Sequence, residues 1–259
     1  MQRFECNGLT YYQFERLNGV THGVFTRLGG VSAAPFDSLN LGGSVGDDPT
    51  CVRENHMRMY DALGVDDASS CSVWQVHGVE VVIADRSVRE QTSFIHADGM
   101  ITDRYDTPLS MRFADCTPIL LHDPVQGVIG MAHAGWRGTV KGMAAGIIGA
   151  MMKTYGCKPV NIVAGIGPSI SVERYQVGAE VIDAARAYFG DIDGLVRIDP
   201  TDGTSYFDLW AANARDLQHV GVEQIEITDI CTAQRTDEFF SHRAEKGKTG
   251  RFGAVICMT

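Results

Sequence analysis

Three side chains that can bind a metal ion stand at or near the ends of apolar segments. His77 follows "VWQV", Cys116 follows "RFAD" and His133 lies in "MAHAG". We expect these segments to be strands, whose ends place side chains at the edge of a sheet, within reach of a ligand. A cysteine and two histidines can bind zinc and leave a fourth position for water, whose pKa such a site lowers towards neutrality. The pattern predicts a metal centre that activates water.

The spacing of these residues also allows other roles. Because each residue comes from a separate segment, a histidine here can instead be a structural or surface residue. Cys116 can be a buried apolar residue, as free cysteine commonly is. A thiol near a histidine also suits nucleophilic catalysis, with Cys116 as nucleophile and His133 or His77 as base. Asp115 in an extended segment would point to the opposite face from Cys116, which favours a supporting role over ligation.

Three arginines stand in or beside loop signals: Arg27 in "TRLGG", Arg137 in "GWRG" and Arg243 in "SHR". Any of them could hold an anion such as phosphate, because a guanidinium donates forked hydrogen bonds. The alternative for each is an exposed or ion-paired surface arginine.

The elements that must position these residues follow from the apolar pattern. Helices are expected at residues 51–63, 139–155, 178–189 and 208–219, with Asp208 as the N-cap of the last. Strands are expected at residues 79–85, 117–123, 127–134, 161–167 and 252–258. Several are continuous apolar runs, which is typical of strands covered on both faces. The mixed order indicates a layered α/β or α+β fold without a regular βαβ repeat.

The expected helix at 139–155 contains three glycines, Gly142, Gly146 and Gly149. Each costs roughly 1 kcal/mol of helix propensity relative to alanine. We therefore infer that this helix packs very close to a sheet.

Composition limits the class of protein. The chain has 259 residues, 44% of them hydrophobic, and no linker, repeat or low-complexity segment divides it, so a single domain over 1–259 is expected. Seven scattered cysteines without paired CxxC spacing indicate reduced thiols, and no signal peptide or long apolar span is evident, so we expect a cytoplasmic protein without a membrane partner. The net charge of -10 argues against a general nucleic-acid binder. The sequence says nothing about oligomeric state.

The order of short motifs resembles a known family. The chain carries, in the order seen in the bacterial YfiH / laccase-domain (multicopper polyphenol oxidase-like) family, the segments "HGVFTRLGGVS", "SLNLGGSVGDDP", "QVHG", "ADGMIT", "ADCTPILLHDP", "AHAGWRGT", "GIGPSIS", "YQVGAEV", "FDLWAAN" and "FFSHR". The match runs from residue 22 to the C-terminus. Two places depart from the family: Phe113 replaces a common Thr before "ADC", and His242 replaces a tyrosine before Arg243-Ala244, where Arg-Arg is usual.

The resemblance implies an α+β fold of the CNF1/YfiH-like kind, with two mixed β-sheets layered between helices (α/β/β/α). It implies that His77, Cys116 and His133 are both the catalytic residues and the ligands of Zn²⁺, which Cu²⁺ can replace in vitro. It further implies a zinc-dependent purine nucleoside phosphorylase acting on adenosine, inosine and methylthioadenosine. Adenosine deamination by metal-activated water is implied as well, so purine nucleosides and phosphate are the expected partners.

Phosphorolysis requires an anion pocket beside the ribose C1′ atom. Arg27 and Arg137 are the candidates for this pocket, and Asn40 is the candidate for a polar contact with the substrate. Arg243 completes the predicted set of substrate-binding residues. These four assignments rest on loop position and on membership of the motifs above.

Two other activities remain as alternatives. The first is a cysteine or metal amidase that edits peptidoglycan precursors, which some family members are linked to. The second is a copper-dependent polyphenol oxidase, or laccase. Multicopper oxidases use His-x-His pairs, and none of the eight histidines forms one. A single His₂Cys set could hold one copper, which transfers one electron at a time and cannot by itself reduce dioxygen to water.

Overall fold

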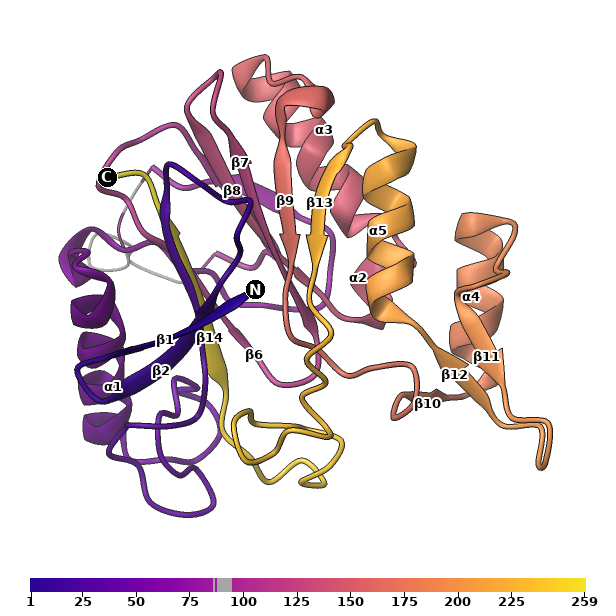
Figure 1. Ribbon diagram of the computed structural model, residues 1–259, viewed down its shortest axis with the longest axis horizontal. Coiled ribbons are helices and arrows are strands. Elements are labelled where there is room, and N and C mark those ends of the chain that lie inside the picture. Colours follow the sequence, from indigo (N-terminus) through magenta and orange to yellow (C-terminus); the bar gives the residue numbers. More distant parts are fainter. Residues whose placement is uncertain (86, 88–94) are drawn as a thin grey trace.

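The computed structural model describes residues 1–85, 87 and 95–259, and these residues form three β-sheets (Figure 1). The first sheet has the strand order β1 (Gln2–Cys6), β2 (Leu9–Gln13), β3 (Thr21–Phe25), β14 (Phe252–Cys257), β6 (Leu109–Phe113). The second has the order β13 (Gln224–Ile227), β9 (Val163–Ile166), β7 (Thr117–Asp123), β8 (Val128–Ala134), β5 (Gly99–Thr102), β4 (Val81–Ile83). The third, smaller sheet has the order β10 (Gln176–Val177), β12 (Ser205–Phe207), β11 (Val196–Ile198).

The described helices are α1 (Pro49–Leu63), α2 (Trp136–Thr139), α3 (Met143–Tyr155), α4 (Ala179–Phe189) and α5 (Leu209–His219), with 3₁₀ turns at Asp67–Ser69 and Pro159–Asn161. Asp48 caps α1 by accepting a hydrogen bond from the Thr50 amide, and Gly64 ends it in the left-handed conformation. Asp208 caps α5, as predicted, by accepting from the Ala211 amide at 2.9 Å. Among these described helices, none has both the length and the apolar character needed to cross a bilayer.

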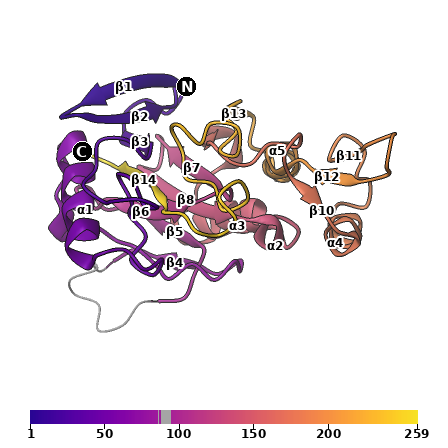
Figure 2. The same cartoon turned by 90° about the horizontal axis from the view of Figure 1, so that it is seen from below.

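The two larger sheets pack against each other, and helices cover their outer faces (Figures 1 and 2). Alternation along β7 shows how the sequence builds these layers, because successive side chains of a strand point to opposite faces. Leu120 packs towards the five-stranded sheet. Its neighbours Ile119 and Leu121 pack towards α3 and α5. Helix α1 covers the outer face of the five-stranded sheet through Met59 and Tyr60.

The prediction of two mixed sheets is correct only in part. The six-stranded sheet is mixed, since β4–β5 and β9–β13 are parallel pairs and the other pairs are antiparallel. The five-stranded sheet is antiparallel throughout. The third sheet was not expected, because its strands of two or three residues are too short to give a periodic signal.

The helix expected at 139–155 begins only at Met143, and a separate short helix precedes it. Helix α2 ends at Thr139, and Gly142 has a φ of +80°, a left-handed conformation that separates it from α3. The inferred reason for the helical glycines is also wrong, because a Cβ added at Gly146 or Gly149 would meet no atom within 4 Å. Close packing comes instead from the strand side, where a Cβ on Gly99 would lie 2.7 Å from Met143 Cε.

The two glycines at the start of α3 give opposite expectations for an alanine substitution. Gly146→Ala should raise the free energy of unfolding by about 0.5–1 kcal/mol, because the site is an open helical position. Gly142→Ala should lower it by about 1–2 kcal/mol, because its φ is positive and a new Cβ would collide with the Tyr188 hydroxyl. Urea denaturation of both variants measures the difference. Equal effects of the same sign would contradict the break in the helix at Gly142.

Candidate metal centre

The structure brings His77, Cys116 and His133 together. One donor atom from each lies within 4.8 Å of the other two, and within the described residues no other three metal-binding side chains gather in this way. His133 is buried in β8, Cys116 is half-buried between β6 and β7, and His77 is exposed. The two imidazole rings lie 4.9 Å apart at an interplanar angle of 75°. The three predicted ligands therefore form one group that could bind a metal. The expectation that each ends a strand is wrong for His77, because the segment before it has only an isolated bridge at Trp74.

The β7–β8 hairpin fixes the position of Cys116 relative to His133. Its register pairs Thr117 with Ala134, so Cys116 lies directly beyond the open end of the hairpin, beside Gly135. A Cβ on Gly135 would lie 2.8 Å from Cys116 Sγ and 3.2 Å from His77 Cδ2. Glycine at this position therefore leaves the space into which the thiol and the exposed imidazole fit.

Asp98, which directly precedes β5, holds both histidines in place. Its carboxylate has no exposed surface and accepts a hydrogen bond of 2.7 Å from His133 Nδ1. It also accepts from the consecutive amides of Val76, His77 and Gly78 at 3.1, 3.0 and 2.6 Å. These amides include that of His77 itself, whose backbone has a φ of +60°. A left-handed non-glycine residue costs roughly 1–2 kcal/mol, which the Asp98 hydrogen bonds offset.

The charges at the site favour a thiolate. Burial opposes ionisation of Cys116, but the charge of His133 and hydrogen bonds with His133 and His77 outweigh it and lower the thiol pKa to about 6. Burial likewise opposes a charge on His133, but Cys116 and Asp98 raise its pKa to about 9. The pKa of Asp98 is lowered, because hydrogen bonds and the charge of His133 outweigh its burial. Without a metal, the site therefore holds a thiolate beside a protonated imidazole.

This donor set fits a borderline-soft divalent metal. Because the Asp98 carboxylate is an acceptor, His133 Nδ1 carries a proton and Nε2 is left as the ligand atom. A thiolate and two imidazole nitrogens are donors that zinc and copper prefer. A metal bound here would take the place of the proton on His133 Nε2.

Asp115 has the supporting role expected of it. Its backbone is left-handed, with a φ of +79°, rather than extended as the sequence suggested. The carboxylate accepts from the hydroxyls of Thr232 and Ser241, both at 2.7 Å, and from the Arg243 amide at 2.6 Å. Asp115 thus ties the C-terminal loop to the residue next to Cys116.

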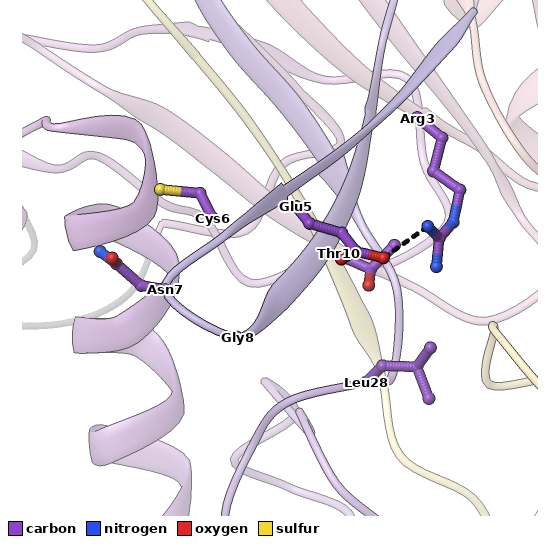
Figure 3. Close-up of a pocket in the computed structure, with 7 residues that line it drawn as sticks. All are labelled: Arg3, Glu5, Cys6, Asn7, Gly8, Thr10 and Leu28. Atoms are coloured by element: carbon purple, nitrogen blue, oxygen red, sulfur yellow. Dashed lines mark hydrogen bonds and ion pairs between the residues drawn. The ribbon is translucent and has the colours of Figure 1, made fainter.

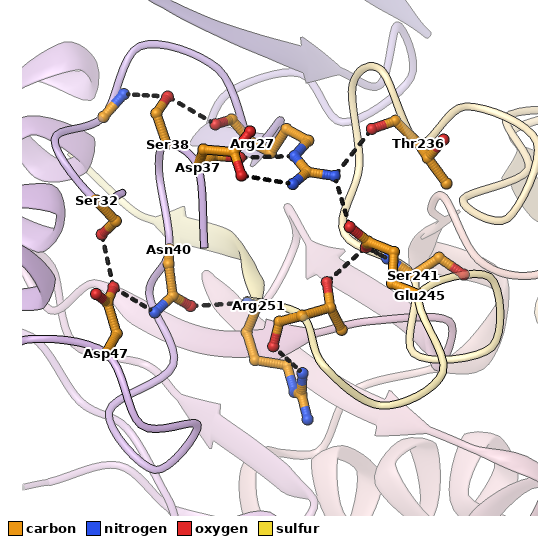
Figure 4. A network of polar contacts seen from close by, with 12 residues as sticks. Arg27, Ser32, Asp37, Ser38, Asn40, Asp47, Thr236, Ser241, Glu245 and Arg251 are labelled. Atoms are coloured by element: carbon orange, nitrogen blue, oxygen red, sulfur yellow. Dashed lines mark hydrogen bonds and ion pairs between the residues drawn. The ribbon is translucent and has the colours of Figure 1, made fainter. Parts of the chain in front are cut away.

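Arg27 and Asn40 belong to a polar network that joins two loops (Figure 4). Arg27 is buried, and its guanidinium donates to the carbonyls of Asp37 and Thr236 and to Glu245 Oε1, at 2.7, 2.9 and 3.0 Å. Asn40 is also buried, with its side-chain amide fully hydrogen-bonded. None of these contacts is with the three candidate ligands. Their substrate-binding role stays a prediction.

The charges of Cys116, Arg137 and Arg243 all act on the hydroxyl of Tyr175. Burial raises the pKa of Tyr175, the negative charge of Cys116 adds to this, and Arg243 and Arg137 oppose it. The Arg243 guanidinium lies 5.0 Å from the Tyr175 ring centre, and the Arg137 guanidinium lies 4.5 Å from the Trp136 ring. Both arginines are exposed.

Sequence reasoning missed the roles of Asp98 and Tyr175. Both residues lie inside quoted segments, "ADGMIT" and "YQVGAEV", but nothing in a lone aspartate or tyrosine indicates its partner.

A separate hollow at the β1–β2 hairpin is lined by Arg3, Glu5, Cys6, Asn7, Gly8, Thr10 and Leu28 (Figure 3). None of the predicted site residues lines it, and its Arg3–Glu5 ion pair is on the surface.

Comparisons with known proteins, by sequence and by structure, all point to one family. Residues 21–259 match the family model described as "Multi-copper polyphenol oxidoreductase laccase". A protein of Deinococcus radiodurans named "Purine nucleoside phosphorylase" is 38% identical over 225 residues, covering 86% of this chain and 83% of the relative. "Purine nucleoside phosphorylase YlmD" of Bacillus subtilis is 37% identical over 233 residues, with the same coverage. The crystal structure of the hypothetical protein YfiH of Bacillus licheniformis is similar with a TM-score of 0.91 and 34% identity over 98% of both chains.

Replacing Asp98 tests its support of the site. In Asp98→Asn, an NH₂ group replaces one of the two carboxylate oxygens that accept from the backbone amides and from His133, so the hydrogen bonds to that oxygen are lost. Affinity for zinc should fall roughly 10- to 100-fold, as measured by competition with a chelator. Glu80→Gln, which changes an exposed carboxylate nearby, is the control. Equal zinc affinity of both variants would show that Asp98 does not support the ligands.

The thiol chemistry of Cys116 can be measured in metal-free protein. Because its pKa is lowered to about 6, Cys116 should be largely thiolate at pH 7 and should react with iodoacetamide there. Burial raises the pKa of Cys157 to about 12, so this cysteine should remain unlabelled. Peptide mass spectrometry over a range of pH gives the rates, and added zinc should protect Cys116. A labelling midpoint above pH 8 would contradict the proposed stabilisation of the thiolate.

Proposed function

The chain belongs to the multi-copper polyphenol oxidoreductase laccase family, and on that premise we propose that it is a zinc-dependent purine nucleoside phosphorylase. Its substrates are adenosine, inosine and methylthioadenosine, and it also deaminates adenosine. The observation that carries the proposal is the meeting of His77, Cys116 and His133 in a chain 38% identical to a purine nucleoside phosphorylase.

The proposed zinc ligands are His77, Cys116 and His133. When bound, the metal would act as a Lewis acid and lower the pKa of water at its open position, which is the chemistry that deamination at the purine C6 atom requires. The chain supplies the geometry. Asp98 keeps the proton on His133 Nδ1 and so directs Nε2 into the group, and it holds the backbone of His77 in its left-handed turn.

Phosphorolysis places further demands on the chain. A phosphate oxygen forms a bond to the ribose C1′ atom while the bond from C1′ to the purine nitrogen breaks, and the leaving base accepts a proton. Arg137 and Arg243 are the proposed ligands of the anion. Among the described residues Arg137 has no hydrogen-bond acceptor, and Arg243 uses Nη1 alone, on the Gln176 carbonyl at 2.9 Å. The Tyr175 ring offers an aromatic surface against which a purine can pack.

Laccase activity has less support, despite the family description. Within the described residues, one group of three donors could hold a metal, whereas reduction of dioxygen to water requires several coppers acting together. Copper bound at this group would give at most a weak oxidase signal.

A cysteine amidase is the second candidate, and one observation favours it. His133 hydrogen-bonds to Asp98 on one side and lies against Cys116 on the other, which is the order of a thiol nucleophile, a base and an orienting carboxylate. Chelation separates the two proposals, because a nucleophilic thiolate acts without metal.

Product analysis tests the proposed function directly. With adenosine and phosphate, the zinc-loaded protein should release adenine and ribose 1-phosphate, together with some inosine. Without phosphate, inosine alone should form. A chelator should abolish both reactions and zinc should restore them, as followed by liquid chromatography. If no purine nucleoside is turned over, the proposal is wrong; an amidase that survives chelation but not alkylation would establish the second candidate.

A further inference from the structure

Arg251 lies beside the candidate metal centre, although no motif pointed to it. It directly precedes β14, in which Phe252 pairs with Phe113 of β6. The Phe113 ring in turn lies 5.8 Å from the Phe252 ring and 5.6 Å from the imidazole of His133. The strand pairing therefore places Arg251 opposite the residues that lead from β6 to Cys116.

The polar network of Figure 4 converges on Arg251. Asn40 Oδ1 accepts from the Arg251 amide at 2.8 Å, and Asp47 holds Asn40 by accepting from its Nδ2 at 2.8 Å. A Cβ on Gly42 would lie 2.8 Å from Arg251 Cγ, so the side-chain stem fits closely against that glycine. The buried Asn40 side chain therefore holds the backbone of Arg251 in place.

Part of the Arg251 guanidinium is unused. Nη1 donates to the carbonyls of Thr249 and Gly250 at 3.1 and 2.8 Å. Among the described residues, Nε and Nη2 have no acceptor, and no carboxylate lies within ion-pair distance. The side chain is half-buried, and such a guanidinium with two unused donors matches the oxygens of a phosphate group.

The surrounding charges act on this guanidinium. Burial lowers the pKa of Arg251, and the negative charges of Cys116 and Asp115 raise it. Among the described residues, Asp115 makes no hydrogen bond or ion pair with Arg251; its oxygens accept from Thr232, Ser241 and the Arg243 amide. A metal held by Cys116 would offset the charge of its thiolate and so leave the positive charge of Arg251 for an incoming anion.

We propose that Arg251 binds the inorganic phosphate co-substrate through its unused Nε and Nη2 donors, and that Asn40 is a positioning residue that holds it. This inference rests on the proposed phosphorylase function. Arg137 and Arg243 are exposed. Arg251 would add a third arginine to the phosphate site, one that Asn40 and Gly42 hold in place.

Calorimetric titration of the zinc-loaded full chain with inorganic phosphate tests this assignment. Arg251→Met keeps the stem against Gly42 and removes the charge, so phosphate affinity should fall roughly 10- to 100-fold. Arg251→Lys keeps the charge but loses the fork, and should bind phosphate with intermediate affinity. Arg186→Met, on the exposed face of α4 with a weak contact to Asp183, is the control and should bind like the unchanged protein.

A thermal melt of each variant shows whether it is folded, and if Arg251→Met unfolds, Arg251→Lys decides the result. In the phosphorolysis assay, the KM for phosphate should rise in both Arg251 variants while the KM for adenosine changes little. Phosphate binding by Arg251→Met equal to that of the control overturns the proposal, as does the absence of phosphate binding by the unchanged protein. If phosphate binds through Arg251 but no nucleoside is cleaved, the phosphorylase function fails and the anion site stands.

Discussion

The buried carboxylate of Asp98 is the interaction on which the candidate site depends. One side chain accepts four hydrogen bonds, three from the consecutive amides of residues 76–78 and one from His133 Nδ1. It therefore sets the backbone of one candidate ligand and the protonated nitrogen of another. A fully buried carboxylate is costly unless it is paired in this way. The amides of residues 76–78 and His133 Nδ1 stabilise the buried charge of Asp98. The same hydrogen bonds hold His77 and His133 in position.

The rest of the fold supplies the surroundings of this interaction. The β7–β8 hairpin places Cys116 beside Gly135, and Asp115 joins the C-terminal loop to the same point. A second network through Arg27 and Asn40 connects the N-terminal loops to Arg251. Elements that are distant in sequence are therefore tied together by these two networks.

The sequence predicted well those features that depend on local pattern. The helices, the long strands and the Asp208 cap follow from periodicity and capping chemistry. His77, Cys116 and His133 could be proposed as ligands from their residue types. Their convergence depends on hairpin register and on the φ of His77, and neither has a local signature. Asp98 could not be identified for the same reason, because its partners lie on two segments that are remote in sequence. The break at Gly142 was missed because a glycine inside an apolar stripe can either continue or end a helix.

The central claim is that His77, Cys116 and His133 bind one divalent metal through two imidazoles and a thiolate. Replacement by cobalt tests it most directly, because cobalt has similar ligand preferences and shows its thiolate bond as a charge-transfer absorption band. The account predicts one cobalt per chain, with a thiolate band that disappears in Cys116→Ser. A band that persists in Cys116→Ser, or a protein that binds no stoichiometric metal, would contradict it.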